Sequence, residues 1–354
     1  MGPRTTTASR PAILLVDSFV ASSRGTYVMT ASLARQLDGA GWRTLTTSSC
    51  SGRVSRLADM LYSTWTLRHR YSLAGVAVYA GRAFAWAEAV CWLLRRLGKP
   101  YVLTLHAGDL PVLGGRRPNR VRRLLQSAAA VTVPSRYLLE EMCSYRADMH
   151  LIANALGIDT YPFRLRSHPR PELVWIRAFH DRYGPTAAPE VVARLARDLP
   201  DVRLAMVGPD KGDGSLARTQ QRAAHLNVAE RIAFCGAVPK AEVPACLDRA
   251  DVFLNTTTVD NTPVSVMEAM ACGLCVISTE VGGIPYLLED GTDALLVPPN
   301  DREAMAVAVR RVLTEPGLAA RLSHNARAKA ERFDWSVVLP QWESLLLSVS
   351  QDTA

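Results

Sequence analysis

The chain has 354 residues, of which 48% are hydrophobic and 21% are charged, and this composition fits two folded domains and excludes a disordered chain. Its longest apolar stretches, residues 12–16 and 84–94, are too short or too interrupted for membrane-spanning helices, which need about 20 apolar residues. The net charge of +8 is unevenly distributed along the chain, because residues 1–171 hold 23 Lys and Arg against 9 Asp and Glu. No nucleic-acid-binding motif accompanies this positive charge, so nucleic acid is not expected as a partner.

The first part of the chain has the pattern of a parallel sheet covered by helices. Residues 1–11 are polar, and we expect them to be a disordered terminus and not a secretory signal. Beyond them, short apolar runs alternate with segments of helical periodicity, which predicts a doubly wound, Rossmann-like α/β domain over residues 12–160. Strands are expected at 12–17, 43–47, 76–79, 101–105, 130–133 and 150–153, and helices at 26–37, 55–67, 83–97, 121–128 and 135–143.

The alternation stops at residues 161–171, where prolines and arginines predict a linker, and then resumes. Residues 172–334 therefore predict a second Rossmann-like domain, and two such domains would face each other across a ligand cleft. Its strands are expected at 173–177, 202–207, 232–234, 252–255, 275–278 and 294–297, and its helices at 189–199, 215–226, 242–249, 263–271, 302–313 and 318–332. Residues 335–354 hold a last amphipathic helix and tail, and we expect this helix to pack back on the first domain.

The segment from Asn255 to Cys275 carries the strongest chemical signal. A strand ends at Asn255, and Thr262 before Pro263 predicts a helix with threonine as its N-cap and proline in its first position. The free N–H groups and positive dipole of such a helix start form a binding site for phosphates. Asp260 in the loop and Glu268 in the helix are well suited to accept hydrogen bonds from sugar and ribose hydroxyls.

Three other positions follow predicted strands and are candidates for ligand contact. Lys211 lies in the glycine-rich turn 208–214, where backbone and cation can both approach a phosphate. His106 follows strand 101–105, where an isolated histidine is more often structural than ligand-binding. Gly236 either lets a nucleotide base lie against the backbone or simply ends a strand.

The seven cysteines are scattered and odd in number, which is typical of reduced thiols in a cytosolic protein. Cys272 and Cys275 form a C-x-x-C pair, but no second pair stands at zinc spacing. We therefore expect neither a metal site nor a redox cofactor.

Several motifs in order resemble the retaining GT-B glycosyltransferases of family GT4. Asp260-x7-Glu268 followed by Ala-Met-Ala-Cys-Gly is similar to the family's E-x7-E signature, with aspartate in place of the usual first glutamate. The resemblance extends to the segments 105–109, 152–159, 282–285 and 295–301, and to Phe333-Asp334-Trp335. Gly25 matches the second glycine of the family's N-terminal G-G loop, although Arg24 stands in place of the first.

The resemblance implies roles for individual residues. Glu268 would bind the donor ribose, Asp260 the transferred sugar, and His106 would reach that sugar from the acceptor side. Arg177 would neutralise the donor's diphosphate. The lysine that usually accompanies this arginine is missing, and either Arg182 or Lys211 would replace it, of which we favour Lys211.

The loop and helix start formed by Asn261, Thr262, Pro263 and Val264 would complete the donor pocket and narrow the choice of sugar. The sequence thus predicts a cytoplasmic glycosyltransferase that uses a UDP-, GDP- or similar nucleotide-sugar and transfers the sugar to a hydroxyl acceptor with retention of anomeric configuration. Envelope polysaccharide or glycolipid assembly is the expected process.

The partner of the basic first domain is less defined. An anionic membrane surface or a lipid-linked or acidic acceptor fits its charge, and so does an ordinary solvated surface rich in arginine. Two alternative functions also fit the expected fold, a nucleotide-sugar epimerase and a non-catalytic relative that binds sugar nucleotides.

Overall fold

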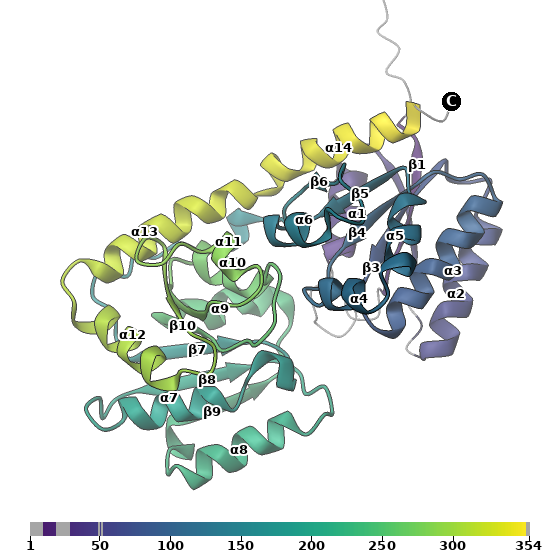
Figure 1. Ribbon diagram of the computed structural model, residues 1–354. Helices are drawn as coiled ribbons and strands as arrows, with labels where there is room; N and C mark the ends of the chain where they lie inside the picture. Colours follow the sequence, from purple (N-terminus) through teal and green to yellow (C-terminus); the bar gives the residue numbers. More distant parts are fainter. Residues whose placement is uncertain (1–9, 19–28, 49, 51, 352–354) are drawn as a thin grey trace, which may run out of the picture. The chain divides into compact units, whose positions relative to one another are not determined.

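A computed structural model describes residues 10–18, 29–48, 50 and 52–351 (Figure 1). Contacts divide the chain into two compact units. The first contains the chain to Val133, Leu139–Ile152 and the chain from Val338, and the second contains Pro134–Leu138 and Ala153–Val337. The predictions for residues 1–9, for Gly25 and for the beginning of helix 26–37 lie outside the described residues.

Six parallel strands form the sheet of the first unit, in the order β2-β1-β3-β4-β5-β6. The inner strands are mostly apolar and buried, as expected of parallel strands covered on both faces, whereas the two edge strands, at 43–47 and 150–151, carry polar or exposed residues. The strands are β1 (Ala12–Val16), β2 (Arg43–Thr47), β3 (Leu73–Val78), β4 (Tyr101–Leu105), β5 (Ala130–Val133) and β6 (His150–Leu151). The helices are α1 (Met29–Gly39), α2 (Arg53–Thr66), α3 (Arg82–Arg96), α4 (Leu110–Arg116), α5 (Pro118–Gln126) and α6 (Arg136–Met142), whose first residues belong to the second unit.

The second unit repeats this architecture with the strand order β12-β11-β10-β7-β8-β9. The strands are β7 (Glu172–Ile176), β8 (Arg203–Val207), β9 (Ile232–Gly236), β10 (Val252–Asn255), β11 (Cys275–Thr279) and β12 (Ala294–Val297). The helices are α7 (Ala187–Leu195), α8 (Ser215–His225), α9 (Val243–Asp248), α10 (Val264–Ala271), α11 (Ile284–Leu287), α12 (Arg302–Thr314) and α13 (Leu318–Ala330), and short 3-10 turns include η2 (Ile158–Thr160), η3 (Asp181–Tyr183) and η5 (Lys240–Glu242).

Alternate residues of β7 enter two cores on opposite faces of this sheet. Leu173 and Trp175 pack with residues of α7 and α12, whereas Val174 and Ile176 pack with residues of α10. The two faces together make β7 a fully covered inner strand.

The last helix, α14 (Trp335–Gln351), enters the first unit at Val338. There Glu343 accepts a hydrogen bond from Trp42 Nε1 at 3.0 Å and pairs with Arg10. The prediction that this helix packs on the first domain is confirmed. Within the described residues, no helix has the length and apolar character that crossing a membrane requires.

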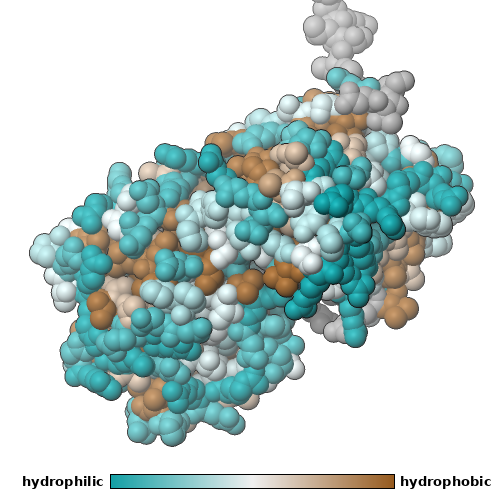
Figure 2. Space-filling model, in the orientation of Figure 1, coloured by the Kyte–Doolittle hydropathy of each residue, from teal (hydrophilic) through white to brown (hydrophobic). Residues whose placement is uncertain are grey.

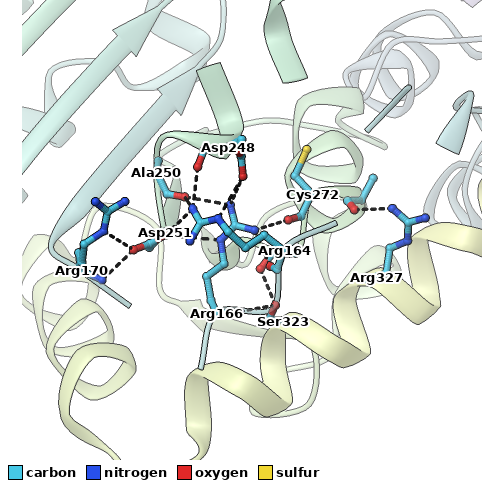
Figure 3. A network of polar contacts seen from close by, with 11 residues as sticks. Arg164, Arg166, Arg170, Asp248, Ala250, Asp251, Cys272, Ser323 and Arg327 are labelled. Carbon is cyan, nitrogen blue, oxygen red and sulfur yellow. Dashed lines mark hydrogen bonds and ion pairs between the residues drawn. The ribbon is translucent and has the colours of Figure 1, made fainter. Parts of the chain in front are cut away.

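The predicted linker, residues 161–171, belongs to the second unit, because its arginines bind acidic residues beside β10 (Figure 3). The buried Asp251 pairs with Arg164 at 2.8 Å, Arg166 at 3.5 Å and Arg170 at 3.3 Å. Burial alone would raise the pKa of Asp251, but hydrogen bonds from Arg170 and Arg164 lower it overall. The boundary between the units falls earlier than we expected, between Ile152 and Ala153.

The same segment also holds the end of α10. Arg166, whose side chain is fully buried, donates to the carbonyl oxygen of Cys272, and Arg327 of α13 donates to that of Ala271 at 2.8 Å (Figure 3). These cations lie where the helix dipole is negative, which stabilises the helix.

Two short helices were not expected from the sequence, α4 and α11. The start of α10 also differs from the prediction. Pro263, and not Thr262, is the residue that precedes the helix, because the Thr262 hydroxyl donates to the carbonyl oxygen of Pro134 at 3.4 Å and does not cap α10.

Candidate functional site

The carboxyl ends of β7, β8 and β10 place the predicted donor-site residues at one edge of the second sheet. Arg177 follows β7, Gly208 follows β8, and the loop 256–263 follows β10. These strands are neighbours and parallel, so the residues after them meet at the same edge.

Arg177 and Asp260 meet there. Arg177 Nη2 forms an ion pair with Asp260 Oδ2, and the guanidinium lies 4.4 Å from the centroid of the Tyr183 ring. Burial lowers the pKa of Arg177, and Tyr183 acts in the opposite direction. The Asp260 carboxylate also favours the charged guanidinium. The Arg177 side chain therefore remains charged at neutral pH. The site therefore contains a charged guanidinium whose charge is balanced by the Asp260 carboxylate.

Glycines allow the loop of Asp260 to pack this closely. A Cβ on Gly282 would lie 2.2 Å from the carbonyl oxygen of Asp260, and a Cβ on Gly283 would lie 2.0 Å from that of Asn261. Gly208 makes a similar approach, since its Cβ would lie 1.8 Å from the carbonyl oxygen of Arg177. The glycines of the segment 282–285 thus have a steric role in shaping the site.

Glu268 lies inside α10 and is 3% exposed. Its Oε1 accepts a hydrogen bond from the Tyr161 hydroxyl at 3.1 Å and pairs with Lys240 Nζ. Burial lowers the pKa of Lys240 to about 7, an effect that the neighbouring carboxylate opposes by stabilising the ammonium. Sequence analysis missed both Lys240 and Tyr161, because neither belongs to a recognisable motif.

The residues at the start of α10 are buried and tied to earlier parts of the chain. Ser135 Oγ donates to Asn261 Oδ1, and Asn154 Nδ2 donates to the carbonyl oxygen of Thr262 at 3.1 Å. Among the described residues, Asn261 Nδ2 and Ser265 Oγ are buried and have no hydrogen-bond partner. Pro263 is buried and Val264 is half-buried beside them. Buried polar atoms of this kind are candidates for ligand contact.

The two candidates for the second cation are exposed in the same unit, with Arg182 in the turn η3 and Lys211 in the loop after β8. The carbonyl oxygen of Arg182 accepts hydrogen bonds from Thr258, and the backbone N–H of Lys211 donates to Phe179 at 3.1 Å. Gly236 is the last residue of β9, with φ +68°, and its carbonyl oxygen accepts from Gly208 at 2.8 Å. The strand-ending role of Gly236 is therefore observed, and its contact with a base stays a prediction.

His106 belongs to the first unit, directly after β4. Its ring stacks on Tyr79 with centroids 5.2 Å apart, and its Nε2 is buried without a hydrogen-bond partner among the described residues. Burial lowers the pKa of His106, and the buried Asp17 acts in the opposite direction. The imidazole is neutral at neutral pH, with one ring nitrogen able to accept a hydrogen bond.

In the described part of the chain, no three His, Cys, Asp or Glu side chains lie together as a metal site requires. Burial raises the pKa of both Cys272 and Cys275 to about 12, which keeps the two thiols protonated and unreactive at neutral pH.

Comparison with known proteins gives matches along most of the chain. The family model described as glycosyl transferases group 1 matches residues 158–329, and that of glycosyltransferase family 4 matches residues 55–160. A D-inositol 3-phosphate glycosyltransferase of Streptomyces bingchenggensis is 26% identical, over 90% of this chain and 77% of that protein. A GDP-mannose-dependent alpha-(1-6)-phosphatidylinositol monomannoside mannosyltransferase of Mycolicibacterium smegmatis is 29% identical, over 63% of this chain and 62% of its own length.

Solved structures resemble the fold over nearly its whole length. Sucrose-phosphate synthase from Thermosynechococcus elongatus aligns with a TM-score of 0.78 at 20% identity, covering 96% of this chain and 99% of that one. HepE of Anabaena in complex with UDP-glucose aligns with a TM-score of 0.74 at 17% identity, covering 96% and 100%. With its two Rossmann-like domains and its two family matches, the chain belongs to glycosyltransferase family 4 and has the GT-B fold.

Proposed function

We propose that this protein transfers a sugar from a nucleotide-diphosphate-sugar to an acceptor hydroxyl with retention of anomeric configuration. The observation that carries the proposal is the meeting of Arg177, Asp260 and the helix of Glu268 in one unit, since β7 and β10, which precede them, are paired. Two solved structures of similar fold support it, since HepE of Anabaena was crystallised in complex with UDP and with UDP-glucose.

Some site residues would act through their charge and others through hydrogen bonds. Arg177, with Lys211 or Arg182, would neutralise the diphosphate as negative charge develops on the leaving group. Glu268 would accept hydrogen bonds from the ribose, and Asp260 from the transferred sugar. His106 would orient that sugar.

The chemical step follows from retention. The acceptor oxygen forms a bond to the anomeric carbon on the face from which the diphosphate departs, as the bond from that carbon to the phosphate oxygen breaks. The acceptor proton moves to the departing phosphate oxygen. No protein nucleophile is needed in this scheme, and no metal ion is assigned to it.

We further propose a lipid-linked or acidic acceptor, used in glycolipid or envelope polysaccharide assembly at the cytoplasmic face of a membrane. Tyr62 and Trp65 of α2 and Trp92 of α3 are exposed, and Figure 2 shows hydrophobic surface in the region of α2. Arg68 lies over the Trp65 ring at 4.5 Å and Arg96 over the Trp92 ring at 5.5 Å. Exposed aromatic and arginine side chains together are typical of proteins that bind anionic membrane surfaces.

Vesicle binding tests the membrane contact. Co-sedimentation with vesicles containing phosphatidylglycerol, and not with phosphatidylcholine alone, is expected for the wild-type chain. Equal recovery with both kinds of vesicle, or with neither, would contradict this part of the proposal.

The donor is tested by a thermal-shift panel of UDP-, GDP- and ADP-sugars, because a ligand at 100 times its dissociation constant adds about 2.7 kcal/mol. Glu268→Ala and Glu268→Gln should lose transfer, whereas Glu230→Gln, at an exposed position of the second unit, should retain it. Full activity in either Glu268 variant would overturn the site. NMR of the donor separates the alternatives: an epimerase changes the sugar without an acceptor, and a binding protein leaves it unchanged.

A further inference from the structure

Glu268, the carboxylate proposed for the ribose, already contacts two other side chains of its unit. Tyr161 follows η2 and donates its hydroxyl to Oε1 at 3.1 Å, and Lys240, the first residue of η5, pairs with the same oxygen. The Lys240 ammonium also lies 5.9 Å from the centroid of the Tyr161 ring. The three side chains form one cluster, in which Lys240 supplies the cation.

The partners differ in their exposure to solvent. The Glu268 side chain is 4% exposed, whereas that of Lys240 is 31% exposed. A carboxylate so deeply buried depends on neighbouring donors and cations to remain ionised, because water does not reach it. Once protonated, it loses much of its capacity to accept hydrogen bonds from hydroxyls.

We propose that Lys240 is a positioning residue of the donor site, which keeps the Glu268 carboxylate ionised and oriented for the ribose hydroxyls. This inference rests on the proposed function, since it concerns the ribose-binding carboxylate. Lys240 acts through Glu268, and Tyr161 fixes the rotamer of the same carboxylate. The short turn η5 thereby joins the functional site, although it carries none of the family's motifs.

Substitutions at Lys240 separate charge from packing. Lys240→Met keeps the length of the side chain and removes its charge, and Lys240→Arg keeps the charge. Lys240→Gln is a second neutral variant in case the methionine chain fails to fold, which circular dichroism checks. Within the described residues, Lys240 and Tyr161 are the titratable groups shown in contact with Glu268.

The first measurement needs no ligand. Infrared spectroscopy follows the carboxylic-acid band of Glu268 through a pH titration of the full chain, and the difference from Glu268→Gln assigns that band. We expect Glu268 to take up its proton at a higher pH in Lys240→Met than in the wild type, and at a nearly unchanged pH in Lys240→Arg.

The second measurement is the dissociation constant of UDP and of GDP by calorimetry between pH 6 and pH 9. For whichever binds the wild type, Lys240→Met should weaken binding at pH 7 about tenfold, as expected when a hydrogen bond to a charged group is impaired. The deficit should shrink toward pH 9, because burial lowers the pKa of Lys240 to about 7 and the wild type then loses its ammonium as well. Lys240→Arg, which stays charged, should restore most of the affinity at pH 7.

An unchanged Glu268 titration in Lys240→Met, or a binding deficit that is equal at every pH, would overturn the inference. If the titration moves as expected but neither nucleotide binds the wild type, the coupling of Lys240 to Glu268 stands and the proposed donor is wrong. The two failures are thereby distinguished.

Discussion

The loop of Asp260 packs directly on Gly283, and Gly283→Ala tests how much the site depends on this contact. The added Cβ would lie 2.0 Å from the carbonyl oxygen of Asn261 and 2.8 Å from its carbonyl carbon. Gly283 has φ −82°, which alanine adopts without strain, so the substitution changes packing alone. Ordinary contacts begin near 3.4 Å, and the loop or α11 must move by roughly 1 Å or more.

The expected cost has two parts. Overpacking of this kind destabilises proteins by about 1–3 kcal/mol. The hydrogen bond from Gly283 N–H to the carbonyl oxygen of Asp260, now 3.1 Å long, would also be weakened, at about 1 kcal/mol. A shift of about 1 Å in the Asp260 loop would lower the rate of sugar transfer by about 100-fold, because reacting groups must be placed within a fraction of that distance.

Chemical denaturation and turnover of the donor measure these two effects. Gly157→Ala is the matched control, since Gly157 lies in the same unit at φ −87° and its Cβ would meet only Thr160 Cγ2, at 3.8 Å. It should fold and react as the wild type does. If Gly283→Ala also matched the wild type in stability and rate, the steric account of the 282–285 segment would be refuted.

Two further predictions concern buried charges. Asp251→Asn removes the buried carboxylate 3.5 Å from Arg166 and leaves that buried guanidinium paired with the half-exposed Asp248 at 3.6 Å, so it should lower the free energy of unfolding by about 3–5 kcal/mol. Asp248→Asn keeps Asp251 beside Arg166 and should cost under about 1 kcal/mol in the same denaturation assay, and equal losses would contradict the reasoning. Burial lowers the pKa of His106 in the folded chain, so as the pH falls below about 6.5 this histidine is protonated in the unfolded chain before it is protonated in the folded chain. The free energy of unfolding therefore decreases as the pH falls through this range. His106→Asn should therefore lose less unfolding free energy than the wild type between pH 7.5 and pH 5.5, and identical pH dependences would disprove the assignment.

The sheets were the most predictable part of the fold. Strands at 43–47, 101–105, 130–133, 252–255 and 294–297 have the expected bounds. All but 43–47 are mostly apolar, buried runs between polar turns, which is the pattern of covered parallel strands. The helices α4 and α11 were missed because α4 contains Gly114 and Gly115 and α11 has only four residues. Short helices of this kind depend on tertiary contacts and leave little periodicity in the sequence.

The candidate site was predictable where a motif fixed the spacing. The motif spacing singled out Glu268 and Asp260 as candidates, and Arg177 meets Asp260 because β7 and β10 are paired. Lys240 was not found, since its contact with Glu268 depends on how the loop after β9 folds over α10. The predicted donor cations Lys211 and Arg182 remain alternatives.

The arginines that hold the end of α10 have a consequence for the evolution of substrate choice. Arg166 and Arg327 fix the carbonyl groups of Cys272 and Ala271, so the helix is secured at the end opposite the 256–263 loop. Under the proposed roles, mutations in that loop would alter which sugar is accepted while the Glu268 carboxylate, proposed for the ribose, keeps its place. A lineage with this arrangement would explore new donors without rebuilding the proposed ribose site.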